Sequence, residues 1–158
     1  QATVMTESLA GLKVGHIMST PVQVVHPDMT VQQLLEMIFA TRHTGFPVTA
    51  NGLVGIVTLT DAQRVPRERL YEARVGDIMT RDVVTVEPTM TAEAALHLMG
   101  ERRIGRLVVV HGGAMVGIVT KKDFLRVVEI VKTRGAAYGP YPPPPPPPGP
   151  PSPPAASS

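Results

Sequence analysis

The feature that most constrains this chain is an internal repeat. Residues 14–18 (VGHIM) return as residues 75–79 (VGDIM), 61 residues later, and the motif Val-x-Pro-x-Met-Thr that begins at Val25 returns at the same spacing. A third block, Gly-Ile-Val-Thr-x-x-Asp, ends at Asp61 and again at Asp123. Three blocks in the same order and at nearly the same spacing indicate two copies of one unit, each about 60 residues long.

Each copy predicts a strand followed by a helix in its first half. Residues 22–25 and 83–86 are rich in β-branched side chains, and the x-Pro that follows each run disfavours a helix there. A Thr then precedes apolar residues at helical spacing over residues 30–38 and 91–99, as a helix N-cap does. We therefore expect a short strand and an amphipathic helix at the start of each copy.

The second half of each copy predicts a hairpin and a second helix. Asn-Gly at residues 51–52 and Gly-Gly at residues 112–113 each separate two apolar runs, which is typical of a β-hairpin. A helix follows each hairpin, short after Asp61 and longer over residues 121–132. Each copy is thus a β-α-β-β-α unit, and the predicted fold class is α/β (α+β).

The small size of one unit predicts how the two copies pack. A unit of about 60 residues buries too little apolar surface to be stable alone. The run at residues 22–25 shows little alternation, so both faces of its small sheet are apolar. We expect the two sheets to pack face to face about a pseudo-twofold axis, with equivalent loops at the rims of one shared cleft.

The repeat and a shift in composition divide the chain into five segments. Most of the 17 prolines lie beyond residue 139, in a stretch without charge, which predicts polyproline II or a disordered solubilising end. An ordered tail of this kind would suit an aromatic groove on a partner. The first residue is Gln, which indicates a piece of a longer chain or a processed chain. The segments are an N-terminal lead-in (1–13), the first repeat unit (14–64), a linker (65–74), the second repeat unit (75–132) and the Pro-rich tail (133–158).

The composition excludes several classes of function. The chain has no cysteine, which rules out a disulfide scaffold, a thiol nucleophile and a cysteine-based zinc site. Its net charge of +2 is too balanced to predict nucleic-acid binding, and none of its apolar runs is long enough to span a bilayer. The five histidines lack the spacing of metal ligands, and neither repeat contains a Ser, His and Asp cluster typical of nucleophilic catalysis. We expect neither a metal site nor an enzyme.

The repeated motifs resemble those of the cystathionine-β-synthase (CBS) domain. The resemblance lies in Ile-Met-x-x-x-Val-x-x-Val, in Gly-Phe-Pro-Val and in Gly-Ile-Val-Thr-x-x-Asp, and it covers residues 14–131. Two such units in tandem resemble a CBS pair, also called a Bateman module. The resemblance implies a non-catalytic, cytoplasmic regulatory module. Its implied ligand is an adenine nucleotide (AMP, ADP or ATP) or S-adenosylmethionine, bound in the cleft between the two units.

The first predicted site lies at Thr58, Thr60 and Asp61, where a strand ends and a helix begins. Backbone N–H groups are unpaired at a helix start and attract phosphate, while the hydroxyls and the carboxylate add polar partners for a nucleotide. The same residues would also serve as a plain helix N-cap. The resemblance implies that the Asp accepts hydrogen bonds from the ribose hydroxyls and that the hydroxyl residues reach the phosphate.

The second predicted site differs in charge from the first. It contains Thr120, Lys122 and Asp123, and Lys121 follows Thr120. The resemblance implies that Arg106 points toward the ligand phosphate. Guanidinium and ammonium groups pair readily with phosphate oxygens. We expect this second site to favour the more heavily phosphorylated ligand, unless these cations are ordinary solvated charges.

The resemblance implies that each site takes its base pocket from the opposite copy. Apolar side chains would hold the purine while backbone groups read its edge. The apolar members of this set also suit plain core packing. The pocket residues are Thr20, Val22, His43 and Thr44 for the Asp123 site, and Arg81, Val83, Ile104 and Gly105 for the Asp61 site.

The resemblance also implies partners. Two modules are expected to form a homodimer through their helices, and the ligand is expected to control an effector that precedes residue 1. Residues 1–13 and 64–66 further resemble the CBS pair at the cytoplasmic end of site-2 type intramembrane metalloproteases, which makes such a protease the expected effector. The competing hypothesis is a dimerisation scaffold that binds no ligand. A Rossmann enzyme is disfavoured because Gly-x-Gly-x-x-Gly is absent.

Overall fold

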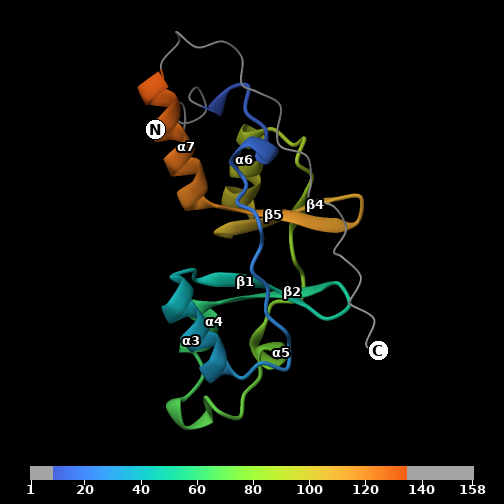
Figure 1. Cartoon of the computed structure of the whole chain (residues 1–158), viewed down its shortest axis with the longest axis vertical. Helices are drawn as coiled ribbons and strands as arrows, with labels where there is room; N and C mark the ends of the chain where they lie inside the picture. The colour runs from blue at the N-terminus through green and yellow to red at the C-terminus, as the bar shows by residue number, and fades with distance from the viewer. Residues whose placement is uncertain (1–8, 135–158) are drawn as a thin grey trace, which may run out of the picture. The chain divides into compact units, whose positions relative to one another are not determined.

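The computed structural model describes residues 9–134, which form two compact units. We call residues 23–84 the Asp61 unit, and residues 9–22 together with 85–134 the Asp123 unit. Figure 1 shows that the second of these combines distant parts of the chain, coloured dark blue and yellow to orange. Residues 1–8 of the lead-in and residues 135–158 of the predicted Pro-rich tail lie outside the described residues, whereas residues 133–134 belong to the last helix.

The Asp61 unit consists of a two-stranded antiparallel sheet and short helices. Its buried core contains Val31 and Leu34 from the first helix, Phe46 and Val48 from one strand, and Val57 from the other. Apolar residues at helical spacing and in alternating strand positions account for this core. The elements are α3 (Val31–Thr41), β1 (Gly45–Thr49), β2 (Leu53–Thr58), α4 (Leu59–Gln63), the 3-10 helix η1 (Arg67–Arg69) and α5 (Val75–Ile78).

The Asp123 unit has the same plan with one more strand. β3 pairs in parallel with β4, and β4 pairs antiparallel with β5. Leu107, Val109 and Val119 of this sheet are fully buried, as are Met99 and Phe124 beside it. The mixed α/β class is therefore confirmed, whereas the face-to-face packing of the two sheets stays a prediction. The elements are α2 (Val14–Ile17), β3 (Thr85–Val86), α6 (Ala92–Arg102), β4 (Arg106–His111), β5 (Ala114–Thr120) and α7 (Lys121–Arg134).

The opening segment of each repeat copy packs with the body of the other copy. At α2 the amide of Val14 donates to the carbonyl of Met90 at 2.8 Å, and at α5 the amide of Val75 donates to that of Met29 at 2.8 Å. The chain after α2 pairs with β5, and the chain after α5 pairs with β2. The compact units are thus offset from the sequence repeats, because each includes the opening segment of the other copy: residues 14–22 in the Asp123 unit and residues 75–84 in the Asp61 unit.

Local signals at the helix starts and hairpins are confirmed. The Thr30 side chain accepts from the amide of Gln33 at 3.1 Å while the Gln33 side chain accepts from the amide of Thr30 at 2.9 Å. Asn51 and Gly52 both have positive φ, 55° and 120°, as a tight hairpin turn requires. The four-residue helices α2 and α5 were not predicted, because they are too short to show a helical period.

The first strand of each copy is shorter than predicted. In the Asp123 unit only Thr85 and Val86 pair, and residues 83–84 are irregular. In the Asp61 unit the predicted strand at residues 22–25 reduces to one bridge between Val25 and Val48. The amide of Thr49 donates to the carbonyl of Val25, but the next donor along β1 falls at Pro47, which has no N–H. The proline therefore ends the parallel pairing after a single residue.

The glycine of each Gly-Ile-Val-Thr block allows a close approach between the sheet and a methionine. A Cβ on Gly117 would lie 2.6 Å from the sulfur of Met18, and one on Gly55 would lie 2.6 Å from the sulfur of Met79. Both methionines follow the short helices α2 and α5. The repeated glycine and the repeated methionine are thus two sides of one packing contact in each unit.

Candidate functional site

The Asp61 carboxylate is fixed where β2 passes into α4. Its Oδ2 accepts from the backbone amide of Thr58 at 2.9 Å and from the Thr58 hydroxyl at 3.1 Å. The Thr58 hydroxyl in turn accepts from the amide of Asp61 at 3.3 Å. This reciprocal capping box uses one carboxylate oxygen fully. Among the described residues, Oδ1 of Asp61 has no hydrogen-bond partner, so it is available to a ligand.

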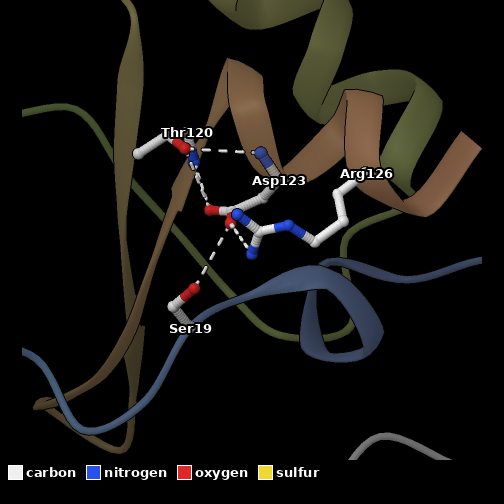
Figure 2. A network of polar contacts seen from close by, with 4 residues as sticks. All are labelled: Ser19, Thr120, Asp123 and Arg126. Carbon is white, nitrogen blue, oxygen red and sulfur yellow. Dashed lines mark hydrogen bonds and ion pairs between the residues drawn. The ribbon is translucent and has the colours of Figure 1, made fainter. Parts of the chain in front are cut away.

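The Asp123 carboxylate repeats this cap and adds two contacts (Figure 2). Oδ2 accepts from the amide of Thr120 at 2.8 Å and from its hydroxyl at 3.1 Å. Oδ1 accepts from the Ser19 hydroxyl at 3.3 Å and lies 3.9 Å from a guanidinium nitrogen of Arg126. Asp123 is only 7% exposed, whereas Asp61 is half-buried. Both oxygens of the Asp123 carboxylate therefore have partners within the same unit, whereas only Oδ2 of Asp61 has partners among the described residues.

A pocket of about 350 Å³ lies beside Asp61, within the Asp61 unit. It contains two carboxylates and two guanidinium groups, together with apolar side chains. The residues come from α4, from the linker that includes η1, and from α5. They are Asp61, Arg64, Val65, Pro66, Arg69, Ala73, Asp77 and Ile78.

The predicted base-pocket residues divide between the units. Thr20 and Val22 belong to the same unit as Asp123, and Arg81 and Val83 to the same unit as Asp61. The other four predicted pocket residues belong to the unit that lacks the aspartate they were predicted to accompany, and the share of all eight in the predicted sites stays a prediction. They are His43 and Thr44 in the Asp61 unit, and Ile104 and Gly105 in the Asp123 unit.

Two of these residues lie directly at the helix starts of their own units. The carbonyl of Thr44 accepts from the amide of Leu59 at 2.8 Å, and the carbonyl of Gly105 accepts from the amide of Lys121 at 3.3 Å. These bonds tie the residue before each hairpin to the first residue of the following helix. Thr44 and Gly105 are therefore parts of the Asp61 and Asp123 surroundings, respectively.

The predicted phosphate residues of the second copy lie at the edge of the same region. Arg106 is the direct cross-strand partner of Thr120 in the register of β4 and β5, and it is half-buried. Lys122 is exposed in the first turn of α7, and Thr60 is exposed in α4. Arg106 is thus the cation among them that the sheet itself places beside the Thr120–Asp123 cap.

Sequence reasoning missed five polar residues of the two surroundings. Ser19 and Arg126 contact Asp123, and Arg64, Arg69 and Asp77 line the pocket beside Asp61. A signal was present for two of them, since each Asp is followed three positions later by an arginine. No sequence signal marks Arg69, because the linker has no counterpart in the repeat.

Neither a metal centre nor a membrane span is found in the part of the chain that the structure describes. Within residues 9–134, no group of three or more His, Asp or Glu side chains could hold a metal ion. Over the same range, no helix combines the length and apolar character needed to cross a bilayer.

Comparison with known proteins identifies the family. The model of the CBS domain matches residues 14–68 and again residues 75–130. The chain belongs to the CBS domain family and carries two such domains in tandem.

Relatives with names and solved structures agree with this assignment. An inosine-5'-monophosphate dehydrogenase of Methanocaldococcus jannaschii is 32% identical over 72% of this chain and 23% of the relative. A zinc metalloprotease of the same organism is 30% identical over 78% of this chain and 34% of the relative. The chain thus spans about a third or less of these two relatives. The crystal structure of CBSX2 in complex with AMP is similar with a TM-score of 0.69 and 30% identity, covering 77% of this chain and 99% of that one.

Proposed function

We propose that this CBS pair is a regulatory module that binds an adenine nucleotide and controls an effector outside the chain. The observation that carries the proposal is the repeated geometry of Asp61 and Asp123. Each carboxylate is held at a strand-to-helix junction by three contacts with a threonine, which fixes Oδ2 and gives Oδ1 one orientation. A positioned carboxylate oxygen is a suitable acceptor for the paired hydroxyls of a ribose.

The surroundings of the two carboxylates also suit a nucleotide. The pocket beside Asp61 combines charged groups with the apolar side chains of Val65, Pro66 and Ile78. Small-molecule sites are usually apolar clefts with a few placed polar groups. The similar structure of CBSX2 holds AMP, which supports the adenosine class of ligand for this chain.

Regulation follows if the ligand binds one arrangement of the module more tightly than another. A ligand shifts a conformational equilibrium only by its difference in affinity for the two states. Contacts to both Asp61 and the α5 segment would join two parts of the chain that the linker separates. The effector is a domain or protein of the kind fused to CBS pairs, and the similarity to a zinc metalloprotease makes an intramembrane protease the first candidate. In that arrangement the module lies on the cytoplasmic side and pairs with a second copy through its helices.

The proposal is tested by following the melting temperature with AMP, ADP, ATP and S-adenosylmethionine. A ligand that binds only the folded chain at a hundred times its Kd adds about 2.7 kcal/mol to the free energy of unfolding. We expect at least one adenine nucleotide to raise the melting temperature, and Asp61→Asn with Asp123→Asn to remove the increase. No increase with any of the four at millimolar concentration would support the dimerisation scaffold instead.

A further inference from the structure

The pocket beside Asp61 contains charges that the described part of the protein leaves unpaired. Within residues 9–134, neither Arg64 nor Arg69 forms an ion pair, although both share the pocket with Asp61 and Asp77. Asp77 uses one oxygen to accept from the backbone amide of Arg74 at 2.9 Å. The pocket therefore offers guanidinium donors and carboxylate acceptors together.

The equivalent charges in the other unit are already engaged with one another. Arg126 is the repeat counterpart of Arg64, and its guanidinium lies 3.9 Å from Asp123. Ser19 occupies the same Asp123 oxygen at 3.3 Å. The guanidinium of the second copy thus lies beside its own carboxylate, whereas that of the first copy forms no ion pair within residues 9–134.

We propose that Arg64 and Arg69 bind the phosphate of a nucleoside monophosphate whose ribose is held by Asp61. This inference rests on the proposed function and assigns the phosphate end of the Asp61 site. Guanidinium groups pair with phosphate through two parallel hydrogen bonds, and two of them surround one phosphate well. The sugar hydroxyls and an amino group of the ligand donate to the carboxylates of Asp61 and Asp77.

The charge balance of the pocket determines which nucleotide it prefers. Two arginines and two aspartates line it, so it has no excess positive charge for a triphosphate. A monophosphate matches the two guanidinium groups without a surplus of negative charge near Asp77. The Asp61 site is therefore selective for AMP over adenosine, and further phosphates add no affinity.

The position of Arg69 gives the phosphate a structural effect. Arg69 lies in η1, within the linker between the repeats, while Arg64 lies directly after α4. A phosphate bound by both residues joins the linker to the end of the first repeat. Adenosine lacks the phosphate and would leave this connection unmade.

The test measures the Kd of AMP, adenosine and ATP by calorimetry on the 158-residue chain and its variants. The variants are Arg64→Gln, Arg69→Gln and the pair combined, with Arg67→Gln as control because Arg67 shares η1 with Arg69 but does not line the pocket. Melting curves without ligand check that each variant folds. Asp61→Asn identifies which binding event belongs to this site.

We expect the wild-type Asp61 site to bind AMP at least tenfold more tightly than adenosine. Each pocket arginine variant should weaken AMP by about tenfold or more and leave adenosine unchanged, because a hydrogen bond to a charged group is lost. Arg67→Gln should keep the wild-type ratio. If the combined variant keeps that ratio while Asp61→Asn removes AMP binding, the phosphate assignment is wrong and the proposed function stands. If the wild type binds neither ligand at millimolar concentration, the proposed function fails as well.

Discussion

The two repeat copies hold Asp61 and Asp123 with the same threonine contacts but surround the two carboxylates differently. Asp123 is 7% exposed, and its second oxygen contacts Ser19 and Arg126. Asp61 keeps its second oxygen without a partner among residues 9–134 and borders a pocket with two unpaired arginines. The repeated motif thus fixes the local backbone and one carboxylate oxygen in both units. Neighbours outside the motif determine whether the other oxygen can accept a hydrogen bond from a ligand.

The largest expected effect concerns the residue after each aspartate, which differs in size between the two units. Phe124 is 1% exposed, and its repeat counterpart is Ala62. We expect Phe124→Ala to lower the free energy of unfolding by about 3–5 kcal/mol, because it leaves a cavity among the buried residues of the Asp123 unit. Urea unfolding measures this loss. Phe39→Ala is the control, since Phe39 is 73% exposed and its change should stay within about 1 kcal/mol. Equal losses in both variants would contradict the core role of Phe124.

The paired glycines provide the second test. A Cβ on Gly55 would meet the backbone carbonyl of Thr80 at 2.9 Å as well as the sulfur of Met79, whereas the three atoms nearest to one on Gly117 all belong to the side chain of Met18. Gly55→Ala should therefore cost roughly 2–3 kcal/mol and Gly117→Ala roughly 1–2 kcal/mol, because a methionine moves more easily than backbone. The reverse order in urea unfolding would show that Met18 is the more rigid of the two methionines.

The hydroxyl residues that follow the two methionines, Ser19 and Thr80, allow a test with a smaller expected effect. The Ser19 hydroxyl donates to Asp123 at 3.3 Å, while the side chain of its counterpart Thr80 forms no hydrogen bond with Asp61 within residues 9–134. Ser19→Ala should lower the free energy of unfolding by about 1 kcal/mol, and Thr80→Ala should change it by less than about 0.5 kcal/mol. A similar change in both variants would mean that the two carboxylates differ less than their contacts indicate.

Much of the local structure could be predicted from the sequence because its signals are local. Thr30, Thr91 and Asn51-Gly52 act through backbone groups within a few residues, and the structure confirms their caps and turn. The threonines and aspartates at the two strand-to-helix junctions belong to the same category. The threonine and the aspartate of each junction contact each other within one motif, so no distant residue is needed to predict the contact.

The remaining features depend on distant parts of the chain. The contact of Ser19 with Asp123 joins residues 104 positions apart, and Arg69 reaches the pocket from a linker that the repeat does not duplicate. Neither spacing nor periodicity carries information on such contacts. The prediction that the Asp123 site prefers more heavily phosphorylated ligands was based on Arg106 and Lys122. It did not include Arg126, whose guanidinium lies 3.9 Å from the Asp123 carboxylate.

The smallest expected effect concerns Pro47 and the length of the first strand. In the Asp123 unit Val108, the counterpart of Pro47, pairs with Thr85, whereas the equivalent pairing before Val25 is missing. Pro47→Val restores the N–H that the carbonyl of Gln23 needs and should extend the parallel pairing toward residue 23. The gain in the free energy of unfolding should not exceed about 1 kcal/mol, so amide hydrogen exchange is the sharper measurement. In this variant the new amide at position 47 should exchange slowly, as expected for its counterpart Val108, which pairs with Thr85. Rapid exchange of this amide would show that a feature other than the missing N–H shortens the strand.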